Sequence, residues 1–422
     1  MDRFQAASLA VVMAIGSAHD LLAQEAATDC SPYTLNGLVR ECTTSGSPGQ
    51  QLRTGTFIAG SAATGETVAQ ALALEVATAP AASSSAGLTY TFDLSTRTFA
   101  RRAGTFGPAF SERAVTIGRG KLSGGVSFLR RSYDKLAALD LGRFDVFRFR
   151  EGTLPITSST LELIAKTETL AGFATYGVAE HVEIGVVVPY VRISVKGTSR
   201  IFDQQDDELQ RVFLSAASDG VGDIGIVSKW HFWSSTPDSD QSDRQVALAA
   251  AAGVRLPTGD SEALLGLGLT RTTLSFIGSA HAGRLSAHVN AGYEFWSDGI
   301  EVPKDFLGQT SIAAKDQVLY SAGFEWEAHP QLSAMFDVLG SYLRGAGGVG
   351  YQPFTFPPNF ANVAGAEALI AVPNGVHRVI LVPGAKWNAF RSLLITMNAL
   401  VTVTSGGLRS NLTPVIGAEW GF

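Results

Sequence analysis

The chain has 422 residues and a formal charge of −6 without a basic cluster, which excludes an electrostatic nucleic-acid-binding surface. Charged residues make up only 17%, yet the sequence lacks the run of about 20 apolar residues that a membrane-spanning helix needs. Together with the 45 glycines, this composition excludes a helical membrane protein and favours tilted strands that have one apolar face and one small or polar face.

Residues 1–23 predict a secretory signal peptide. Arg3 precedes an apolar stretch from Phe4 to Ile15, and small residues follow it. A basic start, an apolar centre and a small-residue cleavage region form an export signal, with cleavage expected after Ala18 or Ala23. The mature chain is therefore expected outside the cytoplasm.

Two cysteines, Cys30 and Cys42, follow the signal closely. An exported chain enters an oxidising compartment, in which paired cysteines form disulfides. The sequence therefore predicts a Cys30–Cys42 disulfide that closes a small loop. The segment has too few ligands for a metal site, and we expect neither a metal nor a cofactor.

Residues 24–112 are small and polar, with few large apolar side chains. A helix is expected from Glu66 to Ala77, since Val68, Leu72 and Val76 share one stripe and Pro80 follows. A brief strand is expected around Tyr90. The segment has too little apolar surface for its own core, and it is either a periplasmic appendage or a plug inside a barrel.

Residues 113–422 predict a transmembrane β-barrel, because alternation with a period of two recurs in stretches of about ten to fifteen residues. In one stretch, the apolar residues from Leu285 to Phe295 alternate with polar or small ones. The fold class is all-β, an antiparallel barrel of about twelve strands. The expected strands are residues 122–133, 160–176, 182–195, 223–232, 246–256, 270–280, 285–295, 317–328, 332–343, 376–387, 393–403 and 412–422.

The connections mostly alternate between short and long, as in outer-membrane barrels with short periplasmic turns and long external loops. Long loops are expected at 134–159, 196–222, 297–316 and 344–375. With both barrel ends in the periplasm the strand number is even. Twelve fits, and ten or fourteen stay open because residues 144–149 can form another strand. All six tryptophans fall at strand ends, where the wall of a barrel meets the membrane interfaces.

The inward face of these strands carries mixed charges. A mixed lining can brace a barrel or coat a polar channel, and aliphatic positions such as Val187, Ala249 and Ile380 argue against a broad water-filled pore. The candidate lumen-lining residues are Glu162, Lys166, Glu168, Glu183, Lys229, Arg255, His288, Glu294, Glu325, Asp337, Arg378, Lys386 and Glu419.

Three polar residues on one strand face, Ser286, His288 and Asn290, form a set that an outer-membrane hydrolase could use. Their apolar neighbours take the lipid side, so these three are expected in the lumen as a polar stripe. A catalytic role is the weaker alternative, and no catalytic residue is assigned.

The carboxyl-terminal residues Gly417, Trp420 and Phe422 form G-x-x-W-x-F, which resembles the signal by which the barrel assembly machinery recognises outer-membrane barrels. Val415 departs from that signal, which usually has a polar residue there. Further stretches resemble the outer-membrane barrels named for the phenol-degradation meta pathway, which are related to fatty-acid and toluene channels. These stretches are FSERAVTIGRGKLSGGVSFLRRSYDKL (110–136), YGVAEHVEIGVVVPYV (176–191), GVGDIGIVSKWHF (220–232), GVRLPTGD (253–260) and SLLITMNALV (392–401).

This resemblance implies a passive channel for small hydrophobic or aromatic compounds in the bacterial outer membrane, with membrane lipids, the assembly machinery and such compounds as its partners. No binding residue of that family carries over to a position here. A structural or surface-recognition barrel without transport is the alternative, and the lumen-facing hydrolase is a weaker one. Substrate identity and the place of residues 24–112 stay open.

Overall fold

The computed structural model describes most of the barrel and parts of the amino-terminal segment. The predicted signal peptide, Cys30 of the predicted disulfide and the terminal Phe422 lie outside the described residues. The described residues are 40–43, 46–48, 50–52, 62–79, 90–93, 98–101, 106–108, 110–149, 158–202, 206–235, 244–303, 310–345, 348–353, 366–372, 374–390 and 392–421.

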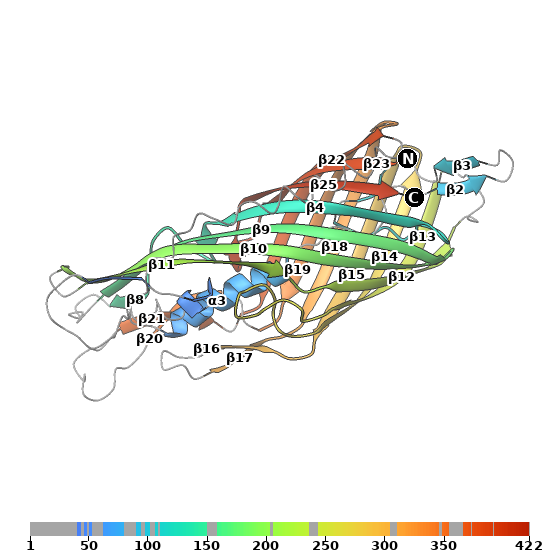
Figure 1. The fold of residues 1–422 in the computed structure, drawn as a ribbon. Coiled ribbons are helices and arrows are strands. Elements are labelled where there is room, and N and C mark those ends of the chain that lie inside the picture. The colour runs from blue at the N-terminus through green and yellow to red at the C-terminus, as the bar shows by residue number, and fades with distance from the viewer. Residues whose placement is uncertain are drawn as a thin grey trace.

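A closed 12-stranded antiparallel barrel forms the body of the protein (Figure 1). Each strand pairs with the next along the chain, and the last pairs with the first, which leaves no open edge in the barrel wall. The structure thereby confirms each of the predicted strands and their number, twelve. The strands are β4 Leu122–Tyr133, β9 Ser158–Ala179, β10 Val182–Phe202, β12 Gly225–Ser234, β13 Arg244–Arg255, β14 Arg271–Ala282, β15 Leu285–Trp296, β18 Gln317–His329, β19 Leu332–Leu343, β22 Val376–Phe390, β23 Leu393–Thr402 and β25 Leu412–Gly421.

The outer face of the barrel carries an apolar band. On β10, Ile184, Val186 and Val188 are all exposed, and they alternate with inward residues such as the buried Glu183. Exposed apolar rows recur on the other strands around the barrel. A soluble protein rarely exposes so large an apolar surface, whereas lipid covers it in a transmembrane barrel.

Tryptophans mark the rim that carries the short turns. Five of them are between 38 and 58% exposed and lie near the strand ends at this rim: Trp230, Trp233, Trp326, Trp387 and Trp420. Indole rings concentrate at membrane interfaces, so this rim lies at one surface of the bilayer. Trp296 differs, since it is buried at the opposite rim. The closed barrel, its apolar band and its aromatic rim make this an outer-membrane protein.

The predicted long loops contain additional strands. Residues 196–222 form a hairpin rather than a loop, because β10 continues to Phe202 and β11 (Glu208–Val221) returns along it. The possible strand at 144–149 exists as two short pieces outside the closed barrel, β7 and β8. The short strands are β1 Arg40–Thr43, β2 Tyr90–Asp93, β3 Thr98–Arg101, β5 Lys135–Leu136, β6 Leu139–Asp140, β7 Phe144–Asp145, β8 Phe147–Phe149, β16 Ile300–Pro303, β17 Thr310–Ala314, β20 Gly348–Pro353, β21 Ala366–Val372 and β24 Leu408–Arg409.

Helix α3 (Ala62–Ala77) contains the predicted helix and begins four residues earlier. Alanine, leucine, glutamate and glutamine favour this conformation. Val68 and Leu72 are buried in one cluster with Leu161 and Ile193, which lie on the inward faces of β9 and β10. The helix therefore sits at the end of the barrel away from the carboxyl terminus (Figure 1). In the described part of the chain, no helix is both long and apolar enough to cross a membrane.

Candidate functional site

A segment just before the barrel, residues 106–117 without 109, crosses the lumen on the side of the short turns, and we call it the strap. Its backbone bonds to side chains of wall strands that lie around the barrel. Lys386 Nζ of β22 donates to the carbonyl groups of Phe106 (3.2 Å) and Pro108 (2.8 Å). The N–H of Phe110 donates to Asp337 Oδ2 of β19 (3.3 Å), and the N–H of Ala114 donates to Ser279 Oγ of β14 (2.8 Å). The N–H of Ile117 donates to Glu183 Oε2 of β10 (2.7 Å). The strap is thus fixed to the wall at several points.

Buried charges reinforce the strap. Lys229 Nζ lies 2.7 Å from Glu183 Oε1 and 3.6 Å from Glu112 Oε2 of the strap. The Lys229 and Glu183 side chains are almost fully buried, so the pair is shielded from water. Breaking such a pair by removing one partner leaves an uncompensated charge in a poorly solvated place. The strap therefore has an electrostatic as well as a hydrogen-bonded anchor.

At the opposite end of the lumen, three wall arginines hold the last turn of α3. Glu75 Oε1 lies 3.0 Å from Arg131 Nη1, and Glu75 Oε2 lies 2.5 Å from Arg378 Nη2. Arg378 also donates to Thr78 Oγ1 (3.1 Å), and Arg255 Nη1 donates to the carbonyl of Ala77 (2.9 Å). The last turn of a helix has free carbonyl groups and a partial negative charge, which cations stabilise. We call this set of contacts the helix clamp.

Between the helix clamp and the strap lies a chamber of about 380 Å³. The end of α3, residues 76–79, lines the chamber on one side, and Phe110 and Glu112 of the strap line it on the other. Much of the wall is apolar. This part of the lining includes Leu129, Ala171, Val187, Val191, Leu265, Leu339 and Ile380.

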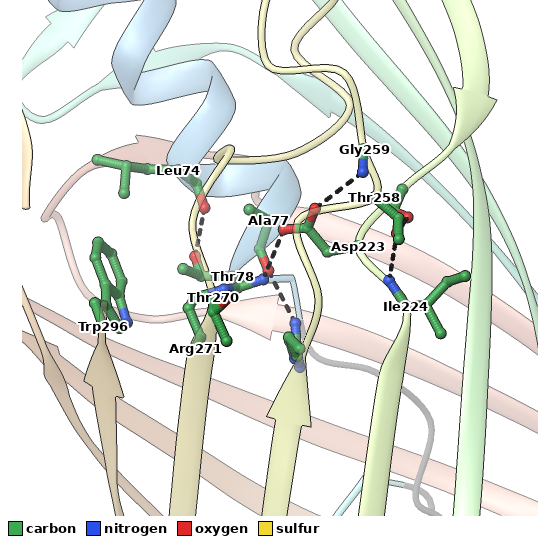
Figure 2. A network of polar contacts seen from close by, with 12 residues as sticks. Leu74, Ala77, Thr78, Asp223, Ile224, Thr258, Gly259, Thr270, Arg271 and Trp296 are labelled. Atoms are coloured by element: carbon green, nitrogen blue, oxygen red, sulfur yellow. Dashed lines mark hydrogen bonds and ion pairs between the residues drawn. The ribbon is translucent and has the colours of Figure 1, made fainter. Parts of the chain in front are cut away.

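The polar wall of the chamber centres on Arg271, which is only 1% exposed (Figure 2). Its Nη2 lies 3.3 Å from Asp223 Oδ2, and its Nη1 lies 3.7 Å from Glu294 Oε1. Asp223 also accepts a bond from the N–H of Gly259 (3.2 Å), and Figure 2 shows this network beside the end of α3. Glu294 accepts bonds from Trp296 Nε1 and Gln317 Nε2, both 2.8 Å long, and from Thr273.

Most of the predicted lumen residues lie on the inward face. His288 Nε2 is 2.7 Å from Asp337 Oδ1, and its Nδ1 is 3.8 Å from Glu325 Oε1. Glu419 accepts a bond from Ser123 Oγ (2.9 Å). The predicted residues that the structure places inside are Glu183, Lys229, Arg255, His288, Glu294, Glu325, Asp337, Arg378, Lys386 and Glu419.

The assignment of Glu162, Lys166 and Glu168 to the inner face is wrong. These residues point outward, where Glu162 pairs with Arg200 and Glu168 pairs with Arg130. The cause is the length of β9, which has 22 residues where about 9–11 suffice to cross the bilayer. Beyond the bilayer the outer face meets water, while the inner face packs against α3, so charges face outward there.

Several residues of the chamber and its helix clamp escaped the sequence analysis: Glu75, Arg131, Asp223 and Arg271. Glu75 had a visible signal, since it is an acidic residue three positions after Leu72 on the apolar side of the helix. Arg131 also had a signal, because alternation from the outward Val126 and Phe128 places it on the inner face, but its partner could not be predicted from the sequence.

The predicted polar set on β15 does not form a catalytic arrangement. Ser286 Oγ bonds to His281 Nδ1 (2.9 Å), while His288 bonds to Asp337. Ser286 and His288 therefore do not pair with each other as a nucleophile and its base, and the histidine within hydrogen-bonding distance of Ser286 is His281 instead. No cluster of potential metal ligands occurs among the residues that the structure describes.

No family model matches the sequence, and no curated protein matches it. Solved structures match at low identity. An outer membrane channel from Pseudomonas putida F1 has 12% identity and a TM-score of 0.46, covering 75% of this chain and 100% of that chain. The translocator domain of the autotransporter NalP from Neisseria meningitidis has 9% identity and a TM-score of 0.35, covering 72% and 89%. The CymD monoaromatic hydrocarbon channel has 12% identity and a TM-score of 0.34, also covering 72% and 89%. The chain is thus similar to known outer-membrane barrels, and its assignment as one rests on its own strand pairing and apolar band.

Proposed function

We propose that the protein is a passive outer-membrane channel for small hydrophobic or aromatic compounds, with no catalytic step. The observation that carries this proposal is the chamber: it is largely apolar, it lies inside the barrel, and the end of α3 and the strap line its two ends. An open porin has a continuous polar, water-filled lumen. A chamber of this size suits one small molecule at a time.

The amino-terminal segment acts in this proposal as a plug rather than as a periplasmic appendage. Its support is the helix clamp, which ties Glu75 and Ala77 to the wall, and the strap, which ties Phe110 and Ile117 to it. The resemblance to the barrels of the phenol-degradation meta pathway supports the same class of permeant. Gly417 and Trp420 would then serve the assembly machinery, which inserts the barrel among membrane lipids.

A second candidate is a structural or surface-recognition barrel whose lumen stays shut. The contacts that tie α3 and the strap to the wall favour it, because these buried bonds must break before either segment can move aside. The two candidates differ in whether the chamber volume matters for uptake.

The test measures uptake of a labelled aromatic hydrocarbon by cells in which the gene is deleted. These cells carry a plasmid that encodes the wild type, Ala174→Phe or Ala171→Phe. The wild type and Ala174→Phe should restore uptake, because Ala174 faces the lipid. Ala171→Phe should reduce uptake several-fold, because Ala171 lines the chamber on the same strand. Uptake at the parental rate in cells without the protein would refute the channel, and equal uptake by the two variants would favour the shut barrel.

A further inference from the structure

Two arginines face each other across neighbouring strands in the chamber wall. Arg255 of β13 and Arg271 of β14 are direct partners in the strand register, and both line the chamber. Like charges at directly opposed positions repel, so such a pair destabilises a sheet unless anions compensate it.

The carboxylates beside this pair leave several donors without an acceptor. Arg271 is almost fully buried, yet its Nε and Nη1 have no hydrogen-bond partner among the described residues. Among the described residues, the guanidinium group of Arg255 has one hydrogen-bond acceptor, the carbonyl of Ala77. The oxygens of Glu294 are already bonded to other donors, and a buried donor without an acceptor is unfavourable.

The formal side-chain charges at the helix end of the chamber add up to one excess positive charge, which the partial negative charge at the end of α3 offsets only in part. Four arginines, Arg131, Arg255, Arg271 and Arg378, meet three carboxylates, those of Glu75, Asp223 and Glu294. Glu112 at the strap end is paired with Lys229. One further negative charge beside Arg255, whose side chain is partly exposed, would balance the formal charge at the helix end and give Arg255 a second acceptor.

We propose that the chamber binds a small monocarboxylate with an apolar body, whose carboxylate lies between Arg255 and Arg271. The planar guanidinium groups suit a carboxylate, because they can donate two parallel hydrogen bonds to it. The apolar body would contact Leu129, Val187 and Ile380, which line the same chamber. This inference rests on the proposed function and narrows its substrate class to compounds with one carboxylate.

The test compares two probes that share one apolar body, 4-phenylbutyrate and 4-phenyl-1-butanol, by equilibrium dialysis against the purified full-length protein in detergent. The wild type should bind the acid more tightly than the alcohol. Arg255→Gln should lower the ratio of acid to alcohol affinity about tenfold, as expected for loss of a charge-assisted hydrogen bond. Arg255→Lys should retain part of the preference. Arg284→Gln, in an exposed turn, should leave both affinities unchanged and serves as the matched control.

Two results would overturn the carboxylate site: equal affinity of the wild type for acid and alcohol, or an unchanged ratio in Arg255→Gln. Gel mobility before and after boiling shows whether each variant is a folded barrel, so that misfolding is not taken for lost binding. Binding of the alcohol without preference for the acid refutes this inference alone. Binding of neither probe counts against the proposed function as well.

Discussion

At the scale of single residues, buried charges with partners from distant segments build the chamber. Arg271 of β14 pairs with Asp223, which lies between β11 and β12, and Glu75 of α3 pairs with Arg131 of β4. A buried ion pair contributes little net stability compared with apolar packing, but loss of one partner leaves the other charge without compensation. Single substitutions in these pairs should therefore have large effects.

The substitution Asp223→Asn tests this statement. It keeps the shape of the side chain but removes the negative charge next to the buried Arg271, so we expect a loss of about 3–5 kcal/mol in the free energy of unfolding. Asp219→Asn is the control, because Asp219 is exposed and should contribute little. Unfolding in denaturant, followed in lipid vesicles, measures both. Equal stability of the two variants would show that Arg271 is compensated by other groups.

The sequence predicts which face a residue takes, because alternation within a strand determines it, but it does not predict the partner. His288 and Asp337 were both assigned to the lumen, yet their contact depends on the register between β15, β18 and β19. Arg271 was missed because it is the first residue of its strand, where the pattern gives little information. Ion-pair partners therefore required the structure.

At the scale of elements, the barrel has two zones that distribute charged and apolar side chains differently between the inner and the outer face. Within the bilayer the outer face is apolar, whereas the inner face mixes charged, polar and aliphatic side chains. In the extensions of β9 and β10, the outer face carries the Glu162–Arg200 pair, while Leu161 and Leu163 pack inward on α3. The strands were predictable because lipid imposes the alternation, whereas the outer hairpins and extensions were not, because no lipid constrains them.

Two matched lysine substitutions locate the boundary between these zones. Phe276 and Ile164 are both exposed apolar side chains, at 71% and 54%, but only Phe276 lies in the middle of a strand that crosses the bilayer. Phe276→Lys should therefore cost about 2–4 kcal/mol in lipid vesicles. Ile164→Lys lies in the extension and should stay within about 0.5 kcal/mol of the wild type. A large cost at both positions would mean that the bilayer covers the extension too.

The helix clamp should determine how often α3 detaches from the barrel wall. Glu75→Gln keeps the size of the side chain but removes the charge that Arg131 and Arg378 share, so α3 should open more often. Hydrogen exchange of the α3 amides should become about tenfold faster or more. Glu66→Gln, nine residues earlier on the same helix, is the control, because it also removes one negative charge from α3. Unchanged exchange in Glu75→Gln would show that apolar packing alone holds the helix.

At the scale of the whole molecule, we infer a plugged barrel rather than an open pore. The strap crosses the lumen at the rim with the short turns, and the last turn of α3 lies at the other end of the chamber. Passage of a molecule then requires movement of at least one of these segments, and a compound that enters an apolar chamber has an advantage over a hydrated ion.

The most direct test of this account is ion conductance of the refolded protein in a planar lipid bilayer, with and without residues 24–112. The deletion removes α3 and the first half of the strap. A plugged barrel should show no steady conductance in the full-length protein and steady current steps after the deletion. Steady conductance of the full-length protein would contradict the closed chamber, and silence of the truncated barrel would contradict the assignment of this segment as the plug.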